Sequence, residues 1–128
     1  MEQGRVAAKR AIVVDDSSAM RSVLRLVLKQ SGFQVLEAKN GADGLQLLKR
    51  SGPVHLALID WNMPEMGGLE MLRAIRLDHS CDAMRVMMVT TETDRDQVQK
   101  ALECGVDEYV MKPFDREMIA DKLQLIGF

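Results

Sequence analysis

The chain has 128 residues, of which 47% are hydrophobic and 28% are charged, and its formal net charge is −2. This length fits one domain with a core of its own, and the composition is that of a folded protein rather than a disordered one. The acidic balance argues against a nucleic-acid-binding protein, and apolar runs of about four to six residues are far shorter than the roughly 20 residues of a membrane span.

Residues 1–10 are expected to be a short lead-in to a single domain over residues 11–128, with no output domain. They carry Arg5, Lys9 and Arg10, but no apolar stretch follows as it would in a signal peptide. The two cysteines, Cys81 and Cys104, match neither a metal-binding spacing nor a disulfide framework. Free thiols without a signal peptide point to a cytoplasmic protein.

Strand and helix patterns alternate along the chain, which predicts a parallel sheet with right-handed crossovers and helices on both faces. Apolar runs typical of buried strands lie at residues 11–14, 33–38, 54–60, 86–90 and 109–111. The first helix follows Asp16, with Ser17 or Ser18 as its N-cap, and ends at Ser31-Gly32. Its apolar residues share one helical face: Met20, Val23, Leu24, Val27 and Leu28.

Turn and capping residues separate the remaining elements. Asn40-Gly41 predicts a turn, after which a second helix ends near Ser51. The apolar positions of the later helices are Leu69, Leu72 and Ile75, then Val98, Ala101 and Leu102, and finally Ile119, Leu123 and Ile126. Asp94 and Asp115 are the expected N-caps of the last two helices.

Polar residues with reactive side chains follow four of the predicted strands: Asp15-Asp16, Asp60, Thr90-Thr91 and Lys112. The carboxyl ends of parallel strands meet at one edge of a sheet, so these side chains are expected to converge there. Gathered carboxylates repel one another unless a hard cation joins them, and Mg²⁺ takes such oxygen ligands. The pattern therefore predicts a magnesium site beside a nucleophile.

An aspartate that accepts a phosphoryl group needs positioning and neutralisation of charge more than covalent help from the protein. The Lys112 ammonium and the Thr90 hydroxyl are expected to meet phosphoryl oxygens. Taken singly, each side chain has a plainer interpretation, as a helix cap or a solvated loop residue. The expected Mg²⁺ ligands are Asp16, Asp60 and the backbone carbonyl of Asn62, with Asp15 acting through water.

Four motifs carry a family resemblance: Val13-Val14-Asp15-Asp16, Asp60-Trp61-Asn62-Met63-Pro64, Gly68-Leu69-Glu70 and Lys112-Pro113-Phe114. With their spacing, they resemble the receiver domain of response regulators, of the CheY-like chemotaxis type. The resemblance extends from about Ala11 to Ile126. It implies a flavodoxin-like, doubly wound (βα)5 fold of class α/β with strand order 2-1-3-4-5.

The resemblance also implies a role for each residue of the predicted site. Asp60 is the phosphoacceptor, and Asp15 and Asp16 are the acidic pair at the Mg²⁺ ion. Lys112 is the lysine typical of the family, and a cis peptide bond between Lys112 and Pro113 is expected to turn it toward the site. The expected phosphodonor is a phosphohistidine on a CheA-like sensor histidine kinase, with small acyl phosphates as substitutes. The protein would then be no conventional enzyme, but one that accepts a phosphoryl group and promotes its own dephosphorylation.

Further positions near the acceptor are implied to tune the reaction rates. Asn62 and Glu92 are of the chemotaxis type, which implies a fairly short-lived phosphorylated state. Gly67 replaces the usual aspartate of the family, and Thr91 replaces a smaller residue, so its bulk is expected to slow the entry of donor or water. Trp61 adjoins the acceptor and should change its fluorescence when Mg²⁺ and then an acyl phosphate bind.

The resemblance places the output on the face formed by the fourth helix, the last strand and the last helix. Thr90 and Tyr109 are implied to be the switch residues that link the site to this face. The partner, such as a flagellar switch component, is expected to contact a monomeric protein at Val98, Leu102, Tyr109, Met111 and Lys122. Alternatively, Val98 and Leu102 are core residues.

Other functions remain as alternatives. A phosphorelay intermediate or phosphate sink would use the same chemistry with a different partner. A phosphatase with an aspartate nucleophile would place a second carboxylate where this chain has Asn62. A nucleotide-binding fold would need a glycine-rich loop after the first strand. A receiver-like module that is never phosphorylated would have no need of the complete set of site residues.

Overall fold

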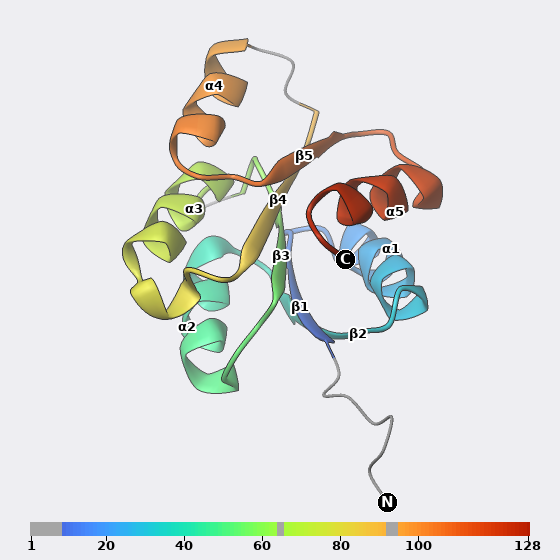
Figure 1. Cartoon of the computed structure of the whole chain (residues 1–128), viewed down its shortest axis with the longest axis horizontal. Helices are drawn as coiled ribbons and strands as arrows, with labels where there is room; N and C mark the ends of the chain where they lie inside the picture. Colours follow the sequence, from blue (N-terminus) through green and yellow to red (C-terminus); the bar gives the residue numbers. More distant parts are fainter. Residues whose placement is uncertain (1–8, 64–65, 92–94) are drawn as a thin grey trace, which may run out of the picture.

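The computed structural model describes residues 9–63, 66–91 and 95–128. Its sheet has five parallel strands in the order β2-β1-β3-β4-β5, which confirms the predicted flavodoxin-like topology (Figure 1). The strands are β1 (Lys9–Val14), β2 (Phe33–Ala38), β3 (Leu56–Asp60), β4 (Arg85–Thr90) and β5 (Glu108–Met111). The helices are α1 (Ser18–Gln30), α2 (Gly41–Ser51), α3 (Gly68–Leu77), α4 (Arg95–Glu103) and α5 (Arg116–Leu125), with a short 3₁₀ helix, η1 (His79–Cys81).

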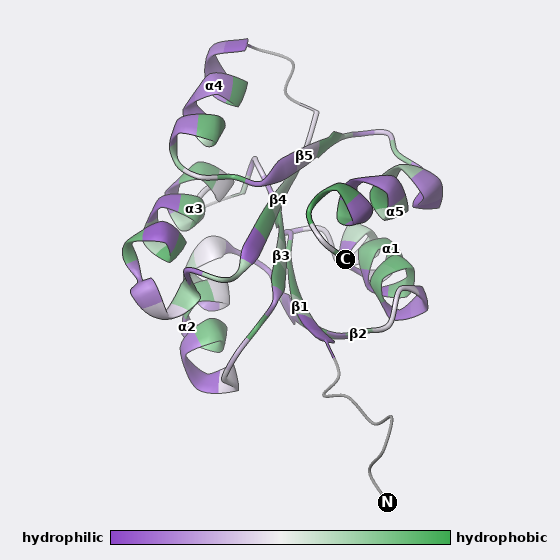
Figure 2. Cartoon of the chain, viewed as in Figure 1, coloured by the Kyte–Doolittle hydropathy of each residue, from purple (hydrophilic) through white to green (hydrophobic). Residues whose placement is uncertain are grey.

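Helices cover both faces of the sheet, with α1 and α5 on one face and α2, α3 and α4 on the other (Figure 1). Successive residues of a strand point to opposite faces. Val13 and Leu58 therefore join the core beneath α1 and α5, while Ile12 and Ile59 join the core on the other face. Because both faces need apolar side chains, a central strand such as β3 is hydrophobic along most of its length (Figure 2). No helix in the described part of the chain is long and apolar enough to cross a membrane.

Two helices begin at the predicted N-cap residues. The Ser17 hydroxyl accepts a hydrogen bond from the Met20 N–H at 3.2 Å. The Asp115 carboxylate accepts one from the Met118 N–H at 2.8 Å. Both side chains satisfy backbone donors that the first turn of a helix leaves unpaired. The predicted cap Asp94 lies outside the described residues.

The interpretation of Asn40-Gly41 as a turn is wrong. Asn40 is the N-cap of α2, since its side-chain oxygen accepts from the Asp43 N–H at 2.8 Å. Gly41 is the first residue of the helix, and a Cβ there would come within 2.8 Å of the Met66 side chain. Asparagine favours both turns and N-caps, and the glycine serves close packing rather than a turn.

Two helices bury narrower apolar faces than the spacing predicts. Val23 on α1 is 48% exposed and Leu102 on α4 is 51% exposed. Each lies at the border of its apolar stripe, where burial depends on the neighbouring element. Ala101 is the buried residue of α4, and Val98 is half-buried. Leu102 is therefore not a core residue, and the alternative interpretation of Val98 and Leu102 as core residues is wrong for Leu102.

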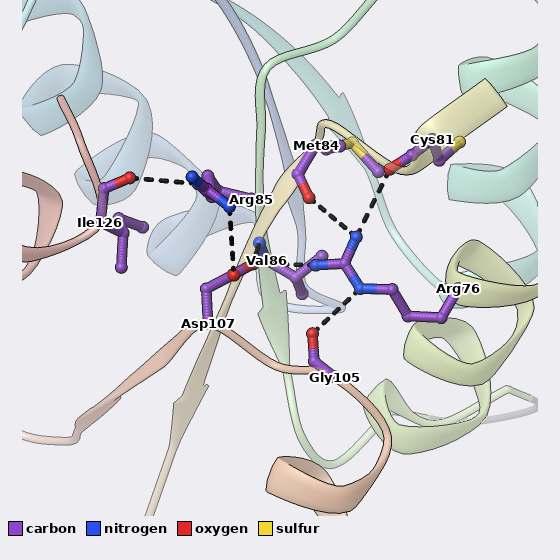
Figure 3. Close-up of polar contacts among 8 residues, drawn as sticks. All are labelled: Arg76, Cys81, Met84, Arg85, Val86, Gly105, Asp107 and Ile126. Atoms are coloured by element: carbon purple, nitrogen blue, oxygen red, sulfur yellow. Dashed lines mark hydrogen bonds and ion pairs between the residues drawn. The ribbon is translucent and has the colours of Figure 1, made fainter. Parts of the chain in front are cut away.

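A polar network joins the elements at the edge of the sheet where β4 and β5 begin (Figure 3). The Arg76 guanidinium donates to the Met84 carbonyl and to the Asp107 carboxylate, both at 2.8 Å. It also donates to the Gly105 carbonyl at 2.9 Å. Asp107 in turn accepts from the Val86 N–H at 2.7 Å. The network ties α3 to the connections that lead into β4 and β5, at the edge opposite to the predicted site.

Gly68 lets α3 begin in direct contact with the end of β3. Its N–H donates to the Trp61 carbonyl at 3.0 Å. A Cβ on Gly68 would lie 2.5 Å from the Asp60 carbonyl oxygen, closer than real Cβ contacts come. A Cβ on Gly67 would lie 3.5 Å from the Trp61 carbonyl oxygen, which is an ordinary contact. The two adjacent glycines therefore differ in the side chains that they tolerate.

Gly68→Ala should lower the free energy of unfolding by about 1–3 kcal/mol, because the added methyl group forces the chain at the end of β3 to move. Gly67→Ala introduces the same methyl group next to it and should lower the free energy of unfolding by only about 0.5 kcal/mol, because alanine is a poorer N-cap than glycine but meets no close contact. Urea denaturation followed by circular dichroism measures both variants. Equal effects of the two substitutions would contradict the close contact at Gly68.

Candidate functional site

The polar side chains that follow the strands come together at one edge of the sheet. Asp15 and Asp16 follow β1, Asp60 ends β3, Thr90 ends β4 and Lys112 follows β5. The exposed fractions of Asp15, Asp60 and Thr90 are 1%, 7% and 3%, whereas Asp16 is open to solvent. One carboxylate oxygen from each of the aspartates lies within 4.8 Å of the others. The topology thus gathers acidic groups at the carboxyl ends of neighbouring strands.

Lys112 places its ammonium between two of these carboxylates. Its Nζ is 3.2 Å from Oδ1 of Asp60 and 3.7 Å from Oδ2 of Asp15. Its backbone N–H donates to the Thr90 carbonyl at 2.8 Å, which continues the pairing of β5 with β4 beyond the strand. The Lys112–Pro113 peptide is cis, as predicted. Lys112 is therefore no solvated loop residue but part of the site.

Asp15 is held by the backbone around it and keeps one oxygen for another group. Its Oδ1 accepts from the Ser17 N–H at 2.9 Å. Among the described residues, none gives a hydrogen bond to the buried Oδ2, whose nearest charged partner is Lys112 at 3.7 Å. Leaving a buried oxygen unsatisfied is costly, so water or an ion usually meets such atoms. With Asp16 and Asp60, it forms a set of oxygen donors that fits a hard divalent cation.

The surroundings of Asp60 change the pKa of its carboxyl group. Burial raises the pKa of Asp60 above its ordinary value of 3.8, and the neighbouring Asp15 carboxylate raises it further. The hydrogen bond and the charge of Lys112 act in the opposite direction without offsetting these effects. One ammonium therefore offsets only part of the cost of burying this carboxylate beside its acidic neighbour.

Thr90 and Tyr109 line the same small cavity, although they come from different strands. The other residues that line it are Trp61, Met88, Val98 and Ala101. The cavity thus connects the residue beside Asp60 with α4. The Lys122 ammonium lies 5.4 Å from the centre of the Tyr109 ring and 3.2 Å from the Glu108 carboxylate.

The residues predicted to meet a partner lie on α4, β5 and α5. Leu102 is exposed, and the half-buried members of the set are Val98, Tyr109, Met111 and Lys122. β5 is an edge strand with β4 as its neighbour in the sheet, and α4 and α5 flank it on opposite faces (Figure 1). The set therefore spans both sides of one edge of the molecule.

Two of the three residues predicted to tune rates lie within the described part of the chain. Asn62 and Thr91 are exposed, and Asn62 lines a groove of about 560 Å³ together with Asp16 and Trp61. Gly67 is the N-cap residue of α3. Glu92 lies outside the described residues.

One contact at the site was not predicted from the sequence. The Arg21 guanidinium, on α1, donates to the backbone carbonyl of Asp15 at 2.7 Å. The only sequence signal is a basic residue beside the apolar stripe of the helix that follows the acidic pair, and such residues are common on helix surfaces.

Comparisons with known proteins agree with the geometry. The family model of the response regulator receiver domain matches residues 11–124. A chemotaxis protein CheY homolog of Campylobacter jejuni is 40% identical over 116 residues, which cover 90% of this chain and 89% of that protein. Chemotaxis protein CheY of Pseudomonas aeruginosa is 39% identical over 118 residues, which cover 91% and 94% of the two chains.

A solved structure, that of the Vibrio cholerae chemotaxis protein CheY4, is similar in fold. It gives a TM-score of 0.86 at 29% identity, and the match covers 92% of this chain and 98% of that one. The family model and these relatives extend over nearly all of the sheet and its helices. The chain therefore belongs to the response regulator receiver family.

Proposed function

We propose that this protein is a chemotaxis response regulator whose Asp60 accepts a phosphoryl group in a Mg²⁺-dependent reaction. The observation that carries the proposal is the buried Asp60 carboxylate, 3.2 Å from the Lys112 ammonium and clustered with Asp15 and Asp16. Relatives that are named CheY support the assignment to chemotaxis. The proposed donor is a phosphohistidine of a CheA-like sensor histidine kinase in the cytoplasm.

In the proposed reaction, a carboxylate oxygen of Asp60 attacks phosphorus, the bond from phosphorus to the donor nitrogen breaks, and an acyl phosphate forms. Lys112 holds a positive charge beside the acceptor, and the Thr90 hydroxyl can donate to a phosphoryl oxygen. A bound Mg²⁺ ion neutralises charge on the carboxylates and on the phosphoryl group. The residues that would hold it are Asp16, Asp60 and the carbonyl of Asn62, with Asp15 through water.

The proposed signal passes from Thr90 to the face of α4, β5 and α5. A ligand shifts a conformational equilibrium only through contacts that differ between the two states. The contacts of Thr90 and Lys112 with the phosphoryl group supply that difference. Because Thr90 and Tyr109 line one cavity, movement of Thr90 toward the site leaves space into which Tyr109 can turn.

The proposed partner is a flagellar switch component that binds the monomeric, phosphorylated protein. Its contacts would be Val98, Leu102, Tyr109, Met111 and Lys122. The phosphorylated state would end by hydrolysis that the protein itself promotes, at a rate set by Asn62, Thr91 and Glu92.

Incubation with acetyl phosphate and Mg²⁺ should add the mass of one phosphoryl group to the wild-type protein. Asp60→Asn should not gain this mass, because the amide is a poor nucleophile. Asp82→Asn removes a similar carboxylate that lies on the surface away from the site, and it should be labelled like the wild type. Intact-protein mass spectrometry measures all three, and labelling of Asp60→Asn would place the acceptor elsewhere.

Asp60→Asn should also raise the free energy of unfolding at pH 7 when Mg²⁺ is chelated. The pKa of Asp60 is raised on folding, so its contribution to stability is present below the unfolded pKa and is lost as the pH rises through the folded pKa. At pH 7 the carboxylate is therefore a net destabilising charge, and the amide removes it. The advantage of the variant should disappear below about pH 3.

Added Mg²⁺ should make the wild-type protein more stable than Asp60→Asn, because the ion is expected to bind the wild type more tightly. Binding to the folded state adds about 2.7 kcal/mol when the ion is at roughly 100 times its Kd. Thermal unfolding with chelator and with Mg²⁺ measures the change, and Trp61 fluorescence is expected to change on binding because Trp61 adjoins Asp60. Equal stabilisation of both proteins by Mg²⁺ would rule out Asp60 as a ligand.

Tyr109→Ala should leave the labelling of Asp60 nearly intact but weaken binding of the phosphorylated protein to the flagellar switch protein by about tenfold. Tyr109 belongs to the proposed output face and lines a cavity with Thr90, outside the cluster of site carboxylates. Leu26→Ala, on exposed surface of α1, is the control and should bind as the wild type does. Titration of the switch protein with and without acetyl phosphate gives both affinities. Unchanged binding by Tyr109→Ala would show that the signal takes another route.

A further inference from the structure

We infer that Arg21 is a positioning residue for the acidic pair, and that it supports Mg²⁺ binding without touching the ion. The inference rests on the proposed function of the Asp15, Asp16 and Asp60 cluster. It starts from one hydrogen bond, in which Arg21 Nη1 donates to the carbonyl oxygen of Asp15 at 2.7 Å. Hydrogen bonds from a charged donor are among the stronger ones in proteins.

The Arg21 side chain is itself fixed by β2. Its Nε lies 3.4 Å from a carboxylate oxygen of Glu37, and its side chain is 19% exposed. Glu37 pairs in register with Val13 of β1. The guanidinium is thereby held between α1, the end of β1 and β2, and its planar fork can serve a carboxylate and a carbonyl at once. It is a rigid donor rather than a flexible surface charge.

The atom that Arg21 holds controls the direction of both acidic side chains. The Asp15 carbonyl belongs to the peptide unit that joins Asp15 to Asp16. Rotation of that unit changes the backbone angles on either side of it, and with them the direction of each carboxylate. The neighbouring Ser17 N–H holds Oδ1 of Asp15 at 2.9 Å, and the Asp15 N–H donates to the Ala38 carbonyl at 3.1 Å, so three hydrogen bonds orient this residue. Asp16, which is exposed, depends on the same peptide plane.

Charge alone predicts the opposite effect on Mg²⁺ binding. A guanidinium near the site repels a divalent cation, so its removal should tighten binding if Arg21 acts only as a charge. Arg25 offers a matched comparison one turn further along α1. Its Nη1 pairs with the same Glu37 at 2.6 Å, but the hydrogen bond to Asp15 comes from Arg21. The two arginines therefore separate positioning from charge.

The test compares the Mg²⁺ affinities of the wild type, Arg21→Ala, Arg21→Lys and Arg25→Ala. Trp61 fluorescence and the shift of the melting temperature with Mg²⁺ measure the affinity. Arg21→Ala should bind Mg²⁺ about tenfold more weakly, as is usual when a residue that orients a metal ligand is lost. Arg25→Ala should stay within about twofold of the wild type. Arg21→Lys keeps a single donor and should recover most of the loss.

The rate of labelling with acetyl phosphate should also distinguish Arg21→Ala from Arg25→Ala. At limiting Mg²⁺ it should be low in Arg21→Ala, and at saturating Mg²⁺ it should return to the wild-type value. Equal Mg²⁺ affinities of Arg21→Ala and Arg25→Ala, or tighter binding by Arg21→Ala, would overturn the inference. If Arg21→Ala does not fold, Arg21→Met decides, because it keeps a long side chain without the donor to the Asp15 carbonyl. Mg²⁺ binding by Arg21→Met as tight as that by Arg25→Ala would overturn the inference, and binding about tenfold weaker would support it. A wild-type protein that does not respond to Mg²⁺ would instead refute the proposed metal site.

Discussion

The rest of this structure depends on one constraint, which is that the fold holds two negatively charged carboxylates close together in a buried site. Asp15 and Asp60 are almost inaccessible to water, and the ammonium of Lys112 lies between them. Buried charges that are incompletely paired cost folding free energy. Two apolar cores, one on each face of the sheet, supply the burial that offsets this cost. The same incompletely paired carboxylates are the oxygen donors that could hold a cation.

Local signals predicted the elements well and their borders less well. The apolar runs of β1, β3 and β4 are long enough to identify buried strands, and Ser17 and Asp115 cap helices through contacts within one turn. Asn40 was misjudged because asparagine suits both a turn and an N-cap. The interpretation of Val23 as a buried residue, and the alternative one of Leu102 as a core residue, were wrong because burial at the border of a helical face depends on which neighbour covers it. The sequence pattern contains no information on that neighbour.

The site shows the same division between local and tertiary information. The acidic pair, the acceptor and the lysine were found because each directly follows a strand, and parallel strands end at a common edge. The strand order itself came from the family resemblance, since the residues alone predicted only a parallel sheet. Arg21 and Arg76 were not found, because they donate mainly to backbone carbonyls. Every residue has such a carbonyl, and only the folded chain determines which one a side chain reaches.

The network around Arg76 has a mechanical consequence for α4. Its hydrogen bond to the Gly105 carbonyl, at 2.9 Å, fastens the chain just beyond the end of α4 at Glu103. Of the residues of α4, Ala101, in the last turn, is the buried one. Because Arg76 belongs to α3, the last turn of α4 is thereby tied to a second helix. A protein that docks at Leu102, in that last turn, would meet a segment whose position is set by an arginine of another helix.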